Sequence, residues 1–110
     1  MDSILTSIKK LLGIEEECKD FDSDIIMPIN SVFMILTQMG VGPKEGFSIH
    51  DKTTTWNDFL KDDQNLEGIK SYIHLKVKLI FDPPLSSAVI EVINKTINEL
   101  EWRLYVATDK

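Results

Sequence analysis

Two histidines, one cysteine and a pair of adjacent serines are the side chains of this 110-residue sequence best suited to catalysis or metal binding. His50 and His74 fit no zinc-binding spacing such as HExxH, and Cys18 is far from both along the chain. Ser86 and Ser87 lack the G-x-S-x-G motif of a nucleophile elbow, and helix capping explains both of them. We therefore expect the histidines to be ordinary surface residues and the serines to begin a helix.

A glycine-rich turn and a small basic ridge are the features that could bind phosphate. The turn GVGP at 40–43 matches neither the dinucleotide-binding pattern nor the P-loop pattern, and it follows a helical pattern instead of a strand. Lys70, His74 and Lys78 recur at the i, i+4 spacing of one helix face, and three such groups neutralise only a few phosphates. We expect this ridge to be a solvated face.

Glu99 and Glu101 are the best candidates for an acid/base pair. Residues two apart on a helix point in different directions, so these carboxylates do not form a dyad. We find no other catalytic, cofactor-binding or metal-binding pattern in the sequence. The sequence therefore predicts a protein that is not an enzyme and that uses no cofactor and no metal.

Charge and cysteine content narrow the range of partners. The 18 acidic and 12 basic side chains give a net charge of −6, and Arg103 is the one arginine. Direct DNA readout draws on clustered cations and on arginine forks, so this composition argues against it.

Cys18 alone cannot form an intrachain disulfide, and neither a signal peptide nor an apolar run of about 18 residues is found. We expect a protein made and kept in a reducing cytosol, with no membrane partner.

Periodic apolar residues and chain breakers predict an all-α fold, a small bundle of about four to five helices in a single domain over residues 1–110. The predicted helices span 3–12, 24–39, 56–61, 66–81 and, beginning at Ser86 or Ser87, a last segment that ends at 106. The corner Asp82-Pro83-Pro84 ends the fourth helix and makes the last two an antiparallel hairpin. A long central loop at 40–56 has alternating residues that are compatible with a short β-hairpin.

Each long helix has an apolar stripe, and several residues depart from it. The stripes expected in the core are Ile25, Ile29, Val32, Leu36 and Met39 on the second helix, and Val89, Ile90, Ile93, Ile97, Leu100 and Leu104 on the last. Met27 and Met34 fall on another face, where core packing and an interface are equally consistent with the pattern. Trp102 projects opposite the last stripe, which favours a contact with another chain. Lys76 lies within a broad apolar face, so we expect a facing carboxylate or a side chain that reaches the edge.

A series of landmarks follows in order along most of the chain. They are the apolar helix 25–39, the turn GVGP at 40–43, Gly46-Phe47, Trp56, the segment IKSYIHLK at 69–76, the corner FDPP at 81–84 and the segment ELEWRL at 99–104. This ordered set resembles the small head-tail connector proteins, also called head-completion adaptors, of tailed phages and prophages of Gram-positive bacteria.

The resemblance implies a structural virion protein without catalytic residues or cofactors. Its copies would form a homo-oligomeric ring, such as a dodecamer, beneath the portal protein, extend the DNA channel, and take part in head completion and tail attachment. Its partners would be other copies of the chain, the portal protein, downstream head-completion or tail proteins, and double-stranded DNA only as passing cargo. The protein would be made in the host cytoplasm and reside at the head-tail interface of the virion. The net negative charge suits a conduit that does not grip DNA.

The resemblance also makes some residues candidates for a subunit contact. They are Trp102, Tyr72, Lys76, Met27, Met34, Phe47 and Ile49. The loop at 40–56 is expected to project toward a neighbouring subunit or the next ring, because its length is otherwise unexplained. The alternative is a small phage or bacterial regulatory module that binds a protein partner as a monomer or dimer. Stable association with a portal protein would favour the connector, and a small closed dimer that ignores portals would favour the regulator.

Overall fold

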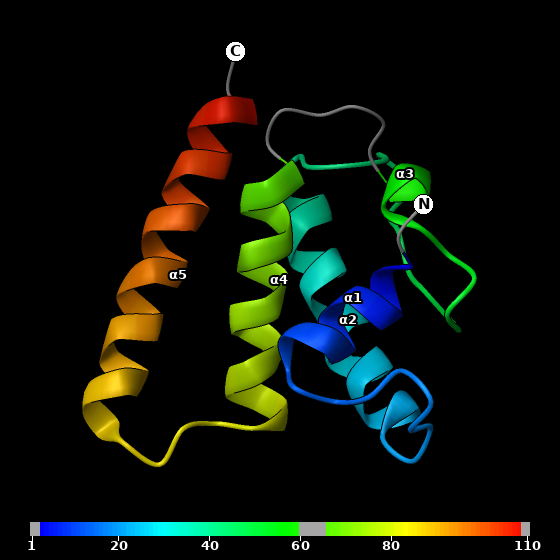
Figure 1. Ribbon diagram of the computed structural model, residues 1–110. Coiled ribbons are helices and arrows are strands. Elements are labelled where there is room, and N and C mark those ends of the chain that lie inside the picture. Colours follow the sequence, from blue (N-terminus) through cyan, green and yellow to red (C-terminus); the bar gives the residue numbers. More distant parts are fainter. Residues whose placement is uncertain (1–2, 60–65, 109–110) are drawn as a thin grey trace.

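The computed structural model describes residues 3–59 and 66–108, and this part of the chain contains five helices and no strand (Figure 1). The helices are α1 (Ile4–Leu11), α2 (Asp22–Gln38), α3 (Trp56–Phe59), α4 (Leu66–Phe81) and α5 (Ser87–Thr108). The all-α prediction is confirmed, and the predicted ends of α1, α2, α4 and α5 agree with the observed ends to within two residues. The predicted end of the third helix at Lys61 lies outside the described residues.

The central element of the fold is α4. On one side of it pack α2 and α1, and α5 packs on the other side (Figure 1). The double-proline corner turns the chain back after Phe81, so α4 and α5 form the predicted antiparallel hairpin. The molecule measures 40 × 36 × 20 Å, and α5 forms one edge of this slab.

The core lies between α2, α4 and α1, and aromatic rings tie distant segments to it. Phe33 on α2 is fully buried, and its ring centroid lies 5.0 Å from that of Phe47 in the loop and 4.7 Å from that of Phe59 on α3. The predicted core stripe of α2 is buried except for Met39, which is half-buried. The apolar periodicity of this helix therefore identified the buried face correctly.

One stripe of α5 joins the same core. Ile93, Ile97 and Leu104 are buried. The half-buried members of the stripe are Ile90 and Leu100. The prediction for Val89 is wrong, because its side chain is 46% exposed. The first turn of α5 lies beside the corner at 82–86 and diverges from α4 (Figure 1), so α4 does not cover it.

A buried lysine fixes the connection between α1 and α2. Nζ of Lys9 lies 2.8 Å from Oδ1 of Asp22. The same ammonium group donates hydrogen bonds to the backbone carbonyl oxygens of Glu16 and Cys18. A buried ammonium is tolerated only with such partners, because its desolvation is costly. The segment between the two helices is therefore wrapped around Lys9.

The loop at residues 39–55 contains no hairpin, so the β-hairpin expected there is not formed. Asn30 on α2 binds both backbone groups of Ile49: Nδ2 donates to the carbonyl oxygen at 2.9 Å, and the N–H donates to Oδ1 at 2.7 Å. A side-chain amide offers the same donor and acceptor as a peptide group, so Asn30 takes the place of a partner strand. Ile49 is buried at this contact, and Val41 in the same loop is buried as well. The contact of this loop with a neighbouring subunit stays a prediction.

Candidate subunit-contact surfaces

Three of the residues expected at a subunit contact lie within the chain's own core. The side chains of Tyr72 and Ile49 are fully buried. Phe47 is half-buried, with its ring against those of Phe33 and Phe59. None of the three presents an open side chain on a single copy, and their place at a subunit contact stays a prediction.

Tyr72 and Lys76 share one carboxylate. The hydroxyl of Tyr72 donates to Oε2 of Glu101 at 2.7 Å, and Nζ of Lys76 lies 3.8 Å from the same oxygen. Burial, followed by this hydrogen bond, raises the pKa of Tyr72. The facing carboxylate expected for Lys76 is confirmed. Both residues interrupt the apolar pattern of α4 because they bridge to α5 within one chain.

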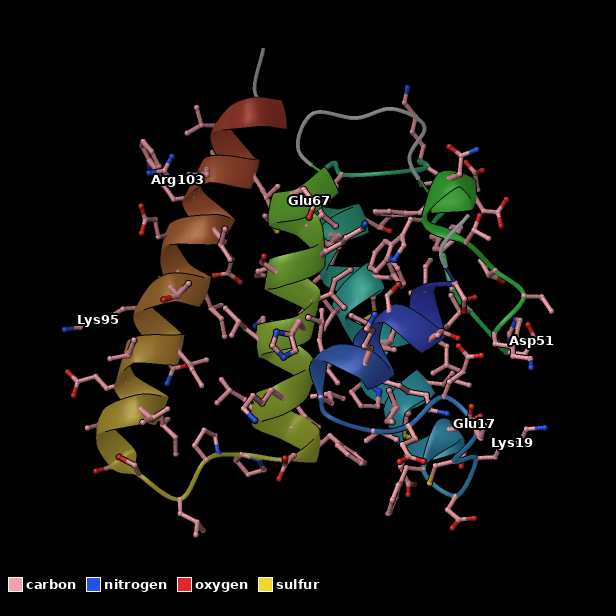
Figure 2. The ribbon with its side chains drawn as sticks, in the orientation of Figure 1. Glu17, Lys19, Asp51, Glu67, Lys95 and Arg103 are labelled. Atoms are coloured by element: carbon pink, nitrogen blue, oxygen red, sulfur yellow. The ribbon has the colours of Figure 1, made fainter. Side chains whose placement is uncertain are left out.

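A second row of residues runs along α5, opposite its core stripe. Steps of four and three residues alternate along this row, which we call the α5 outer seam: Ala88, Val92, Lys95, Glu99, Trp102 and Val106. The side chains of Trp102, Val92 and Val106 are 66%, 62% and 49% exposed, and Lys95 points away from the rest of the molecule (Figure 2). The outward direction expected for Trp102 is confirmed. Alternating steps of three and four residues are the spacing with which one helix packs along another.

An exposed row also runs along α2. We call it the α2 methionine row, and it consists of Asp24, Met27, Ser31, Met34 and Gln38. Met27 and Met34 are 74% and 58% exposed, so both belong to the surface and not to the core. Methionine side chains are flexible and polarizable, which makes such a row adaptable to a partner surface.

The two rows lie on two separate helices. Helix α4 stands between α2 and α5 (Figure 1), and each outer helix buries its apolar stripe toward the middle of the slab. The α5 outer seam and the α2 methionine row are therefore separated by α4. Each copy of the chain presents two different rows with exposed apolar side chains to its surroundings.

A family model for phage connector proteins matches residues 4–110. The chain belongs to the phage connector protein family. This match confirms the resemblance to head-tail connectors drawn from the sequence, and it assigns the chain a structural role in a phage. A search of curated proteins and a search of solved structures found no match.

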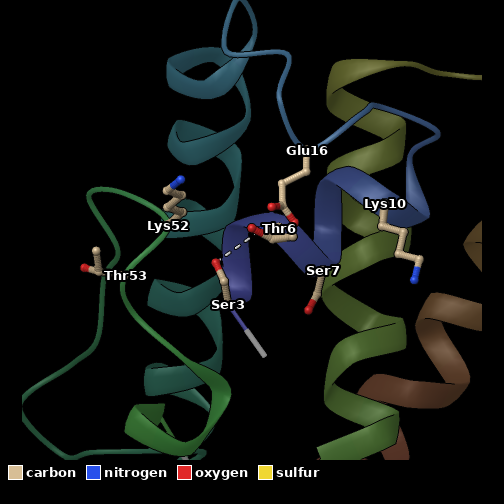
Figure 3. Close-up of a pocket in the computed structure, with 7 residues that line it drawn as sticks. All are labelled: Ser3, Thr6, Ser7, Lys10, Glu16, Lys52 and Thr53. Carbon is tan, nitrogen blue, oxygen red and sulfur yellow. Dashed lines mark hydrogen bonds between the residues drawn. The ribbon is translucent and has the colours of Figure 1, made fainter. Parts of the chain in front are cut away.

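The connector has a polar pocket of about 530 Å³ between the first turns of α1 and the loop before α3 (Figure 3). Its lining residues are Ser3, Thr6, Ser7, Lys10, Glu16, Lys52 and Thr53. The hydroxyl of Ser3 accepts from the backbone N–H of Thr6, and the hydroxyl of Ser7 accepts from Nε1 of Trp56. Both serine oxygens thus hold the fold together, as a helix cap and as an indole acceptor, and neither of these bonds is to a general base.

The two histidines of the connector differ in their surroundings. His50 is exposed, as expected. His74 is half-buried, and its Nε2 atom is buried without a hydrogen-bond partner among the described residues, so the surface prediction for it is wrong. Burial, and then the charge of Lys78, lower the pKa of His74, whereas a backbone hydrogen bond with Leu11 raises it. The C-terminal end of α1 covers this part of α4, which the sequence pattern of α4 alone does not show.

The described part of the connector contains neither a cluster of metal-binding side chains nor a membrane-spanning helix. Among residues 3–59 and 66–108, no three His, Cys, Asp or Glu side chains are grouped so that they could hold a metal ion. No helix in the same ranges is both long enough and apolar enough to cross a bilayer. Cys18 is a half-buried free thiol.

Proposed function

We propose that copies of this connector assemble into a ring beneath the portal protein and extend the channel through which packaged double-stranded DNA passes. The observation that carries the proposal is the pair of different rows of exposed apolar side chains on α2 and α5, two helices that α4 separates. A contact between two different surfaces repeats from copy to copy, and it closes into a ring when the rotation between copies permits. The family match over residues 4–110 supports the same role.

In this ring, the α5 outer seam of one copy packs against the α2 methionine row of the next copy. Trp102 supplies a large apolar surface, and Met27 and Met34 supply flexible thioethers that make favourable contacts with aromatic rings. Burial of these side chains between copies removes apolar surface from water, which is the main driving force for association. Tyr72, Lys76, Phe47 and Ile49 then act within each copy by holding its helices and loop in place.

The charge of the chain agrees with a passage for DNA. A net charge of −6 gives the ring an overall repulsion from phosphate groups, so DNA passes through without being gripped. The portal protein on one side and head-completion or tail proteins on the other are the expected partners in the virion. The match over nearly the whole chain favours this connector role over a regulatory module that acts as a monomer or dimer.

The test is co-assembly of the purified chain with the portal protein of the same phage. Density-gradient sedimentation followed by electron microscopy is expected to show a closed ring of connector density on the portal. The variant Met34→Glu places a charge within the α2 methionine row and should prevent ring closure, because a charge buried in an apolar contact is costly. Ser48→Glu adds the same charge at an exposed loop position and serves as the matched control.

Two results would contradict the proposal. One is a chain that does not sediment with the portal at any ratio of the two proteins. The other is a ring that forms equally well with Met34→Glu and with Ser48→Glu, because the α2 methionine row would then not be a subunit contact.

A further inference from the structure

We infer that two copies of the free connector pair through their α5 outer seams, with the two helices antiparallel. The basis is the order of chemical types along the seam. From the N-terminal end, the seam presents a small residue, an aliphatic residue, a cation, an anion, an aromatic residue and an aliphatic residue. When a second copy of the helix runs antiparallel, cations face anions and smaller apolar residues face larger apolar residues.

The charged centre of the seam sets the register. When a two-fold axis passes midway between Lys95 and Glu99, Lys95 of each copy faces Glu99 of the other copy, and two ion pairs form. The side chains of Lys95 and Glu99 are 76% and 61% exposed, so they are accessible to a second chain. Within one copy they pair with Glu91 and Arg103 on the helix surface, at 3.7 Å and 2.8 Å. Exposed pairs of this kind are weak, so these charges can be shared with a partner.

The apolar ends of the seam fall into place in the same register. Val92 of each copy faces Trp102 of the other, and Ala88 faces Val106. Each layer thus combines a smaller side chain with a larger one, which is the arrangement that fills the space between two helices without voids. The exposed side chains of Val92 and Trp102 lose contact with water, and this burial supplies the driving force.

Other registers lack this complementarity. Parallel helices would set Lys95 against Lys95 and Glu99 against Glu99, and like charges repel across an interface. An antiparallel pair shifted by one heptad would set Lys95 against Val106 and Glu99 against Trp102, which buries charge against apolar groups. The sequence of the seam therefore specifies one orientation and one register.

The pair has a definite stoichiometry. Both copies use the same surface, so the contact is complete with two chains and does not extend to a third. It occupies the seam that the proposed ring needs, so the pair and the ring exclude each other. The inference rests on α5 alone and does not require that the proposed ring be correct.

Sedimentation velocity of the full chain over a wide concentration range, with no portal protein present, tests the pairing. The wild-type chain should show a reversible equilibrium between monomer and dimer. Lys95→Glu sets two glutamates against each other in the pair, and Glu99→Lys does the same with lysines. Each should raise the dimer dissociation constant by roughly tenfold or more, because like charges then face each other twice.

Two combinations of the same charge changes should restore dimerisation. The double variant Lys95→Glu/Glu99→Lys restores opposite charges across the antiparallel pair and should dimerise like the wild type. An equal mixture of the two single variants should form a mixed dimer, although each variant alone stays monomeric. Lys19→Glu and Glu17→Lys are the matched controls, since both positions are exposed and lie on the opposite side of the molecule (Figure 2). Circular dichroism of each variant confirms that helical content is unchanged.

Several outcomes would overturn the inference. The wild-type chain could be monomeric at every concentration, or it could form rings without the portal. The single charge changes could leave the dimer unaffected, or the double variant could fail to dimerise. Portal rings formed by a chain that does not pair would refute only the pairing. A chain that pairs but ignores the portal would refute the proposed ring and favour the regulatory alternative.

Discussion

The α2 side of the molecule and its α5 edge differ in how much of each helix is covered. Contacts from α4, α1 and the loop at 39–55 surround α2, whereas α5 packs mainly against α4 through one stripe. The covered residues of α2 therefore contribute chiefly to stability, and only its methionine row is open to other chains, whereas α5 keeps the face opposite its stripe open. Substitutions of covered residues are expected to lower stability, and substitutions on the two exposed rows are expected to change assembly.

The largest effect is expected from Phe33→Ala in the covered region. Phe33 is fully buried between the rings of Phe47 and Phe59, so truncation leaves a cavity and should cost about 3–5 kcal/mol of unfolding free energy. Urea denaturation followed by circular dichroism measures this loss. The control Phe21→Ala removes a ring that is 44% exposed and should cost clearly less. Equal losses for the two variants would contradict the central place given to Phe33.

A smaller loss is expected when the support of the loop is removed. Asn30→Ala leaves the backbone N–H and carbonyl of the buried Ile49 without their partner, which should cost about 1–3 kcal/mol. Hydrogen exchange should show faster exchange at the Ile49 amide in this variant. Asn94→Ala on α5 is the control, because Asn94 is exposed and its replacement should change stability by no more than about 0.5 kcal/mol.

A pH-dependent effect is expected at His74. Its pKa in the fold lies below the ordinary value of 6.5, so the unfolded chain binds the proton more readily. The neutral histidine therefore contributes stability above about pH 6.5, and this contribution is lost as the pH falls through the folded pKa. His74→Gln should flatten the curve of unfolding free energy against pH in this window. His50→Gln, at an exposed position, is the control, and a slope unchanged by His74→Gln would contradict the assignment.

The smallest effect on stability is expected from Trp102→Ala on the α5 outer seam. Its side chain is 66% exposed, so the unfolding free energy should change by no more than about 0.5 kcal/mol. Ring formation on the portal and pairing of the free chain should both weaken, because the largest apolar group of the seam is gone. Sedimentation measures ring formation and pairing, and circular dichroism measures the helical content. A parallel loss of helicity and assembly would show that Trp102 belongs to the core.

The features of the fold that the sequence predicted are those that repeat along a helix. Apolar residues three and four apart fix one face of α2 and of α5, and the double proline after Phe81 fixes the turn between α4 and α5. Val89 fits the α5 pattern equally well and is still exposed, because periodicity does not tell where two neighbouring helices diverge. Of the proposed contact surfaces, Trp102, Met27 and Met34 could be predicted as departures from the main stripes.

Long-range polar contacts were not predictable in the same way. Lys9 and Asn30 look like ordinary polar positions, and their partners lie in segments without a periodic pattern. Glu101 had a weak signal, since it follows Ile97 by four residues and precedes Leu104 by three, which places it at the edge of the core stripe. Tyr72 lies four residues before Lys76, so both can reach that edge from α4.

The placement of two different rows on separate helices of one slab has a consequence for the growth of the proposed ring. A chain of copies joined through unlike surfaces always has one free α2 methionine row at one end and one free α5 outer seam at the other. Its two ends fit each other, so addition stops by itself when they meet. A pair joined through α5 has two free methionine rows and no free seam, so pairs cannot extend one another. If the proposed pairing occurs, it therefore limits growth of the proposed ring to the copies that remain single.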